Sequence, residues 1–240
     1  TIGDAHSACL CGAPYGINEL TQSNPGDVEG VVHFAYDLQS PTSEVETGLY
    51  AELDSWRTLL KRIGLIGQAP GRYDGFGFGN LSVRLPDAPA EFLITASQTS
   101  GVESLTTDEL VRVTGFDLNR FWVEAEGTQP PASETLTHAM LYAGDERINW
   151  VMHAHSPEIW GEHQHLRLPV TPSEVPYGSP TMVRAVSRLL TDNLSRPLVF
   201  ATLGHTDGVF ACGGSSRDSG GLLVTYLARA MQLETLGLNP

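Results

Sequence analysis

The chain has 240 residues, of which 41% are apolar and 18% charged, as is typical of a soluble globular protein. Its 14 Lys and Arg against 28 Asp and Glu give a formal net charge of −14. This charge argues against nucleic acid or an anionic membrane as a partner, because either requires a basic face. No apolar run approaches the ~18 residues of a membrane span. Residues 1–20 lack a secretory signal pattern, and the three cysteines are interpreted as reduced thiols, so we expect a cytoplasmic protein.

The N-terminal part of the chain shows no sustained periodicity. Residues 1–28 are rich in Gly, Pro, Asn and Ser, which predicts an extended arm in front of a domain formed by residues 29–240. Alternating apolar residues indicate a short strand within 31–36. Apolar residues then recur at helical spacing up to residue 63, which predicts a helix capped at its start by Thr42 or Ser43.

Residues 71–84 contain alternating glycines that resemble a dinucleotide-binding fingerprint. The third glycine of that motif is replaced by Asn80, and a strand-like sequence follows instead of a helix, so the fingerprint is rejected. Two interpretations remain equally open: a flexible turn that leads into a strand, or a loop whose backbone amides and Asn80 contact a ligand.

The next segments predict strands separated by polar loops. Residues 91–95 predict a buried strand, and the hydroxyl-rich loop 96–101 behind it can donate hydrogen bonds to an anion. Thr106 and Glu109 form a capping box, which predicts a short helix. Residues 116–124 predict a further strand.

Residues 130–142 predict a helix, with Gly144 as its stop. Glu134 and His138 are four residues apart and share one face of it. A carboxylate in the first turn is favoured by the helix dipole, so Glu134 taken alone requires no chemical role.

The central feature of the chain is a strand that ends in a histidine pair. His153 and His155 are two residues apart, so on a strand covering 150–155 both imidazoles leave the same face. Paired imidazoles are favoured ligands of borderline transition metals. Ser156 and Pro157 then predict an N-cap and the first turn of a helix. We therefore place the floor of an active site here.

Three more histidines need separate interpretations. His163 and His165 repeat the same spacing but have polar neighbours and no supporting strand, which indicates a solvated loop. His205 lies in a predicted hairpin turn between strands 198–203 and 209–212, where a side chain can be directed precisely.

Two helices complete the prediction. One starts at Pro180, and a long C-terminal helix starts at Ser215 or Ser216. Gly220 and Gly221 inside the second helix each cost roughly 1 kcal/mol relative to Ala, which predicts a close backbone contact there.

Taken together, these motifs resemble the class II aldolase/adducin family from about residue 45 to the C-terminus. The blocks that carry the resemblance are GNLSVR (79–84), FLIT (92–95), LT (105–106), Ser133-Glu134 with His138, HAHSP (153–157), YGSP (177–180) and His205 before Gly208. One block can arise by chance, whereas seven in the family's order are highly specific.

The resemblance implies roles for individual residues. It implies a catalytic divalent metal held by three histidines: His153, His155 and His205. We expect zinc first, with iron, manganese or cobalt as alternatives. Glu134 is implied as the group that transfers the proton, and His138 as a residue that orients its neighbours. The implied substrate-binding residues are Asn80, Ser97, Gln98 and Ser133.

The implied function is that of a metal-dependent lyase, which breaks a C–C bond or performs related enediolate chemistry on a hydroxy-carbonyl compound. Gln98 and Ala132 replace a glycine and a serine that bind phosphate in the family, so we expect a substrate without phosphate. Two alternatives stay open: a non-haem iron(II) oxygenase acting on an aromatic hydroxy or keto acid, and a non-catalytic scaffold like adducin. The scaffold is disfavoured because all the implied ligands are present.

The expected fold is α/β, a single three-layer domain with a mainly antiparallel central sheet and helices on both faces. The resemblance also implies a homo-oligomer, commonly a tetramer, and a small-molecule substrate as the partner, with no role for nucleic acid or membrane.

Overall fold

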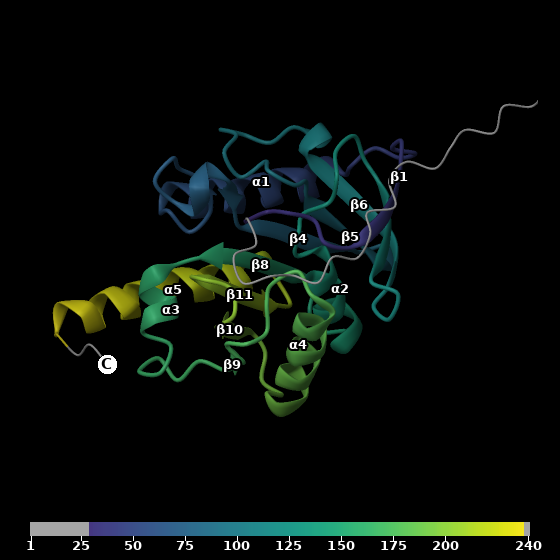
Figure 1. The fold of residues 1–240 in the computed structure, drawn as a ribbon. Coiled ribbons are helices and arrows are strands. Elements are labelled where there is room, and N and C mark those ends of the chain that lie inside the picture. Colours follow the sequence, from purple (N-terminus) through teal and green to yellow (C-terminus); the bar gives the residue numbers. More distant parts are fainter. Residues whose placement is uncertain (1–28, 238–240) are drawn as a thin grey trace, which may run out of the picture.

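A computed structural model describes residues 29–237 of the chain (Figure 1). The expected arm of residues 1–28 lies outside the described residues, so the division of the chain into arm and domain stays a prediction. Within the described part, no helix combines the length and the apolar character that a membrane span needs.

A nine-stranded mixed sheet forms the middle layer of the described residues, in the order β1-β7-β6-β5-β4-β8-β11-β10-β9. Its strands are β1 (Ala35–Gln39), β4 (Asn80–Leu85), β5 (Ala88–Thr95), β6 (Leu110–Asp117), β7 (Trp122–Glu126), β8 (Trp150–His155), β9 (Val170–Thr171), β10 (Leu198–Thr202) and β11 (Gly208–Gly213). A separate two-stranded sheet pairs β2 (Gly67–Gln68) with β3 (Gly77–Phe78).

The sheet is mainly antiparallel, as predicted, but it is mixed because its two edge strands pair in parallel. The pairings from β7 through to β10 are antiparallel, whereas β1 pairs with β7 and β9 pairs with β10 in parallel. A short hairpin forces two strands to be antiparallel. The edge strands β1 and β9 reach their partners through long connections, which leave the strand direction free.

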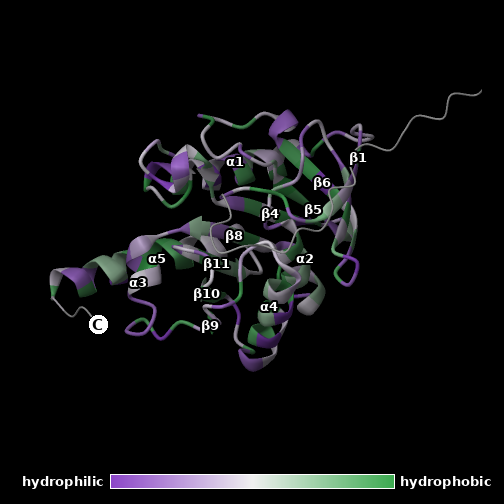
Figure 2. Ribbon diagram, viewed as in Figure 1, coloured by the Kyte–Doolittle hydropathy of each residue, from purple (hydrophilic) through white to green (hydrophobic). Residues whose placement is uncertain are grey.

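Helices cover both faces of the sheet, as predicted. One face carries α1 (Thr47–Arg62), α3 (Pro157–Gly161) and α5 (Ser216–Thr235), and the other carries α2 (Thr135–Gly144) and α4 (Pro180–Asp192). Apolar residues follow the strands between these layers (Figure 2). Along β8 the residues alternate, so that Trp150 and Met152 face α5 while Val151 faces α2. His153 and His155 therefore lie on the α2 face.

The first helix starts later than the periodicity predicted. The side chain of Glu46 caps α1 by accepting hydrogen bonds from the backbone N–H groups of Gly48 and Leu49, both at 2.8 Å. The predicted caps, Thr42 and Ser43, lie in the preceding segment without regular structure. A carboxylate can satisfy the first free N–H groups as a hydroxyl does, which is why composition alone misplaced the cap.

The predicted strand over 116–124 is wrong, because the chain turns in its middle. Asp117 accepts hydrogen bonds from the N–H groups of Asn119 and Arg120, both at 2.9 Å, and Phe121 takes a left-handed φ of +54°. This Asp turn separates β6 from β7. The strand predicted within 31–36 is likewise displaced, since β1 begins only at residue 35.

Other local predictions are confirmed. Thr106 and Glu109 form the capping box of a 3₁₀ helix, η2 (Thr107–Glu109), and Ser156 caps α3 in front of Pro157. A second 3₁₀ helix, η1 (Tyr73–Gly75), lies in the glycine-rich segment. Gly220 packs against the Trp56 ring of α1, as the predicted close contact requires, whereas Gly221 has no neighbouring atom where a Cβ would lie, so the prediction is wrong there.

Candidate metal centre

The histidine pair on β8 forms the base of the site. His153 and His155 are both completely buried, and their Nε2 atoms lie 3.2 Å apart. His153 Nδ1 lies 3.2 Å from the carbonyl oxygen of Val209, which can accept a hydrogen bond from the Nδ1–H group. This contact assigns the proton of His153 to Nδ1 and leaves the Nε2 lone pair directed into the site.

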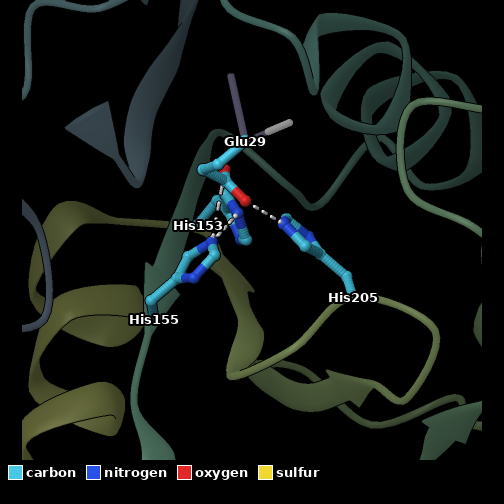
Figure 3. A group of neighbouring side chains, drawn as sticks. All are labelled: Glu29, His153, His155 and His205. Carbon is cyan, nitrogen blue, oxygen red and sulfur yellow. Dashed lines mark hydrogen bonds and ion pairs between the residues drawn. The ribbon is translucent and has the colours of Figure 1, made fainter. Parts of the chain in front are cut away.

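His205 joins the pair from the turn between β10 and β11. The antiparallel register places Gly208 opposite His155, and this brings the turn over the end of β8. The His205 ring centroid is 5.2 Å from that of His153 and 4.6 Å from that of His155. The three histidines predicted as metal ligands thus gather at one place (Figure 3).

A fourth side chain, which the sequence analysis did not identify, completes the cluster. Glu29 Oε2 lies 2.8 Å from His205 Nε2, and Glu29 Oε1 lies 3.6 Å from His155 Nε2. One ligand atom from each of the four residues lies within 4.8 Å of the others. Glu29 belongs to no motif and stands apart from the histidines in sequence, so no signal singled it out.

The cluster fits a divalent metal. Metal–nitrogen bonds of about 2.0–2.1 Å in tetrahedral geometry place neighbouring ligand nitrogens roughly 3.3 Å apart, close to the 3.2 Å between His153 and His155. Burial lowers the pKa of His153 to about 4 and that of His155 well below its usual value, so both are neutral at pH 7, the form in which histidine binds a metal. Burial would also lower the pKa of His205, but the Glu29 carboxylate overcomes this effect and raises it.

Glu134 lies at the N-terminus of α2 and is almost fully buried, with 3% of its surface exposed. Its Oε2 accepts hydrogen bonds from Asn80 Nδ2 at 2.6 Å and from Ser133 Oγ at 2.8 Å. Its Oε1 has no partner among the described residues. One carboxylate oxygen is therefore fixed while the other is available to accept a proton. Asn80 lies opposite His153 across the β4–β8 pairing, which places Glu134 beside the histidines.

All four residues predicted to bind substrate line one small pocket. They are Asn80, Ser97, Gln98 and Ser133. Glu29 and Glu134 line the same pocket, and none of the described residues in its lining is a lysine or arginine. Gln98 takes a left-handed φ of +59°, and its Oε1 accepts a hydrogen bond from the Gly77 N–H at 2.9 Å. The glycine-rich segment thus contributes a wall of the pocket, in line with the ligand-contacting interpretation of residues 71–84.

His138 lies deeper in the protein than the cluster. Its Nδ1 is 2.6 Å from Ser82 Oγ, and its ring packs at 5.7 Å from the ring of Phe210, which stacks on His153 at 4.3 Å. It therefore borders the site through Phe210, and its orienting role stays a prediction. His163 and His165 are outside the cluster and lie in turns after α3, as predicted.

Two tyrosines enclose the histidines and were not predicted as site residues. The Tyr177 ring stacks on His205 at 4.5 Å, and the Tyr73 ring meets His155 edge-on at 4.6 Å. The Tyr73 hydroxyl donates to Asp207 at 2.6 Å, and burial together with this bond raises its pKa. Tyr73 lies in the glycine-rich segment 71–84 and Tyr177 in the YGSP block, and these two motifs were the available signals.

Comparisons with known proteins were made for both sequence and fold. The family model described as "Class II Aldolase and Adducin N-terminal domain" matches residues 71–218. A methylthioribulose-1-phosphate dehydratase of Gluconobacter oxydans (strain 621H) is 32% identical over 108 residues, 43% of this chain and 47% of that protein. The match thus spans about half the length of this curated relative.

Solved structures share the fold at low sequence identity. An L-fuculose-1-phosphate aldolase from Thermus thermophilus superimposes with a TM-score of 0.58 at 22% identity, covering 80% of this chain and 96% of that one. A sugar-phosphate aldolase from Thermotoga maritima gives a TM-score of 0.56 at 17% identity, covering 80% and 97%. Because the family model matches more than half of its residues, this chain belongs to the class II aldolase/adducin family.

Proposed function

We propose that this chain is a divalent-metal-dependent lyase that acts on a small hydroxy-carbonyl compound. The observation that carries the proposal is the convergence of three buried histidines beside Glu134, whose Oε1 is unpartnered among the described residues. The names of the relatives, a dehydratase and two aldolases, support a lyase. A non-catalytic scaffold would have no need to keep these three imidazoles and this carboxylate together.

Different residues of the site bind the metal, accept the proton and hold the proton acceptor in place. A divalent cation on His153, His155 and His205 would supply Lewis-acid polarisation of a carbonyl oxygen. Glu134 accepts the substrate proton at Oε1, while Asn80 and Ser133 hold its other oxygen in place. Burial keeps bulk water away from this proton transfer and strengthens the charge interactions within the site.

The pocket lining and the names of the relatives favour different classes of substrate. The pocket lining has two carboxylates, Glu29 and Glu134, and no lysine or arginine, which disfavours a phosphate dianion. The Gluconobacter relative is named for a phosphorylated sugar, and the comparisons do not support the absence of phosphate. We propose a non-phosphorylated substrate on the chemistry of the lining residues alone.

The test combines metal analysis with turnover. The protein is purified without added metal, its bound ion is identified by mass spectrometry, and hydroxy-keto acids and ketoses with and without phosphate are assayed in the presence and absence of oxygen. We expect oxygen-independent turnover that a chelator abolishes, with the unphosphorylated member of each pair preferred. A preference for the phosphorylated member would overturn the substrate proposal alone.

The control uses the other histidine pair. His205→Ala should lose the metal, whereas the double variant His163→Ala, His165→Ala should keep it, because these rings lie outside the cluster. Bound iron together with oxygen consumption during turnover would favour the non-haem iron(II) oxygenase over the lyase. A wild-type protein that binds no divalent metal would overturn the proposal.

A further inference from the structure

Glu29 occupies the side of the histidine cluster that faces the pocket. Its side chain is 9% exposed, and its two oxygens are directed at different histidines, Oε2 at His205 and Oε1 at His155 (Figure 3). None of the motifs that carry the family resemblance includes this residue. It reaches the site from the segment before β1, whereas the histidines belong to β8 and to the turn before β11.

The residue after Glu29 is seated in the substrate pocket. The carbonyl oxygen of Gly30 accepts a hydrogen bond from Ser97 Oγ at 3.4 Å, and a Cβ at position 30 would collide with Gln98 Nε2. Gly30 also takes a left-handed φ of +74°. Ser97 and Gln98, which were predicted to bind substrate, therefore lie against Gly30, the residue next to Glu29.

We propose that Glu29 is a fourth metal ligand supplied by the chain, which a substrate must displace. This inference rests on the proposed metal centre. A hydroxy-carbonyl compound that chelates a cation on the three histidines would need two oxygen positions beside them, and the two Glu29 oxygens lie beside His155 and His205. Gly30 lines the pocket through which such a compound would enter. Glu29 and Gly30 thus act as an internal competitor that keeps water and unsuitable anions from the metal.

The chemistry of the ligand suggests what replaces it. A carboxylate oxygen is a suitable ligand for zinc, iron, manganese and cobalt alike. A small carboxylate or α-hydroxy acid offers the same oxygen donors as Glu29. We therefore assign the exchange to ligands that bear such donors, and acetate is the simplest probe of the vacated position.

The experiment measures the metal rather than turnover. The wild-type protein and Glu29→Gln are loaded with Co²⁺, their visible absorption is recorded, and their affinity is measured by competition with a chelator. We expect Glu29→Gln to bind the metal at least ~10-fold more weakly and to show an altered d–d spectrum, because a ligand has been lost. Acetate should restore the wild-type spectrum in Glu29→Gln and leave the wild-type protein unchanged at the same concentration.

Two further variants make the result specific. Gly30→Ala keeps the carboxylate but should displace it, because a side chain is strained at the left-handed φ of +74° that Gly30 takes, so its spectrum should change in the same direction. Glu234→Gln removes a charge from an exposed position of α5 and should leave both affinity and spectrum unchanged.

The outcomes separate this inference from the proposed function. If wild-type protein binds no divalent metal, the proposed function fails and this inference with it. If wild-type protein binds metal and Glu29→Gln matches it in affinity, spectrum and response to acetate, Glu29 is not a ligand. In that case the three-histidine centre stands without it.

Discussion

The Glu134 carboxylate has its two oxygens in different environments. Oε2 accepts hydrogen bonds from Asn80 and Ser133, whereas Oε1 has no partner among the described residues. Leaving a buried carboxylate oxygen without a hydrogen bond costs free energy. Such an unpaired atom is consistent with a function that needs it free.

Replacing Glu134 by Gln should abolish proton transfer and leave the metal in place. An amide of nearly the same shape can keep a contact to Asn80 but cannot accept a proton at the reacting position. We expect kcat to fall by about 10²–10⁴-fold, measured with the substrate that the panel identifies. Glu146→Gln, at an exposed position after α2, is the matched control. Loss of the bound metal from Glu134→Gln would show that Glu134 acts as a ligand instead.

The place of the histidines in the candidate site could be predicted from the sequence, whereas the place of Glu29 there could not. The spacing of His153 and His155 together with a strand pattern carries a geometric meaning, and the turn residues around His205 indicated a hairpin. A single glutamate in a segment without periodicity carries no such geometric meaning. Its contact depends on how residues 29–34 cross the finished sheet, which is decided by tertiary packing.

At the scale of an element, α5 holds two adjacent glycines in opposite environments. Gly220 faces the Trp56 ring of α1, while Gly221 has open space where a Cβ would lie. The pair allows a packing effect to be separated from helix propensity within one helix.

Gly220→Ala should destabilise the protein, and Gly221→Ala should stabilise it. The first adds a methyl group that Trp56 must move to admit, at a cost of about 1–3 kcal/mol. The second gains helix propensity of up to about 1 kcal/mol without a new contact. Urea unfolding followed by circular dichroism measures both. A change of the same sign in the two variants would contradict the packing argument.

Helix caps that belong to a two-residue motif could be predicted from the sequence, whereas a cap or turn formed by a single carboxylate could not. Thr106 with Glu109 and Ser156 with Pro157 mark helix starts that the structure keeps. The Glu46 cap and the Asp117 turn use single carboxylates that are equally common on exposed surfaces. Only the folded backbone shows which carboxylate accepts such bonds.

At the scale of the whole molecule, the candidate metal centre connects distant parts of the chain. Its candidate ligands come from β8, from the turn before β11 and from the segment before β1. The expected homo-oligomer and the expected cytoplasmic location stay predictions. The parallel pairing of the two edge strands could not be predicted, because β1 and β9 find their partners across long stretches of sequence, where no local pattern sets direction.

Removing the metal should destabilise the entire fold. A ligand that binds only the native state adds about 2.7 kcal/mol to the free energy of unfolding when its concentration is 100 times its dissociation constant. We expect the unfolding temperature to fall after dialysis against a chelator and to recover on addition of Zn²⁺. His205→Ala should show neither change. Equal unfolding temperatures for the wild-type protein with and without metal would argue against a bound cation.

The pairing of Asn80 with His153 has a consequence for how this molecule can vary. A single strand register aligns the Asn80 amide, which donates to Glu134, with the His153 imidazole of the candidate metal site. A change of this register would therefore displace both groups relative to each other. Inserting residues into the β4–β5 turn would lengthen the hairpin and leave that alignment intact. Deleting one residue of β4 behind Asn80, with β5 holding its register, would turn Asn80 to the face on which Leu81 now lies and so separate the Asn80 amide from Glu134 and the histidines.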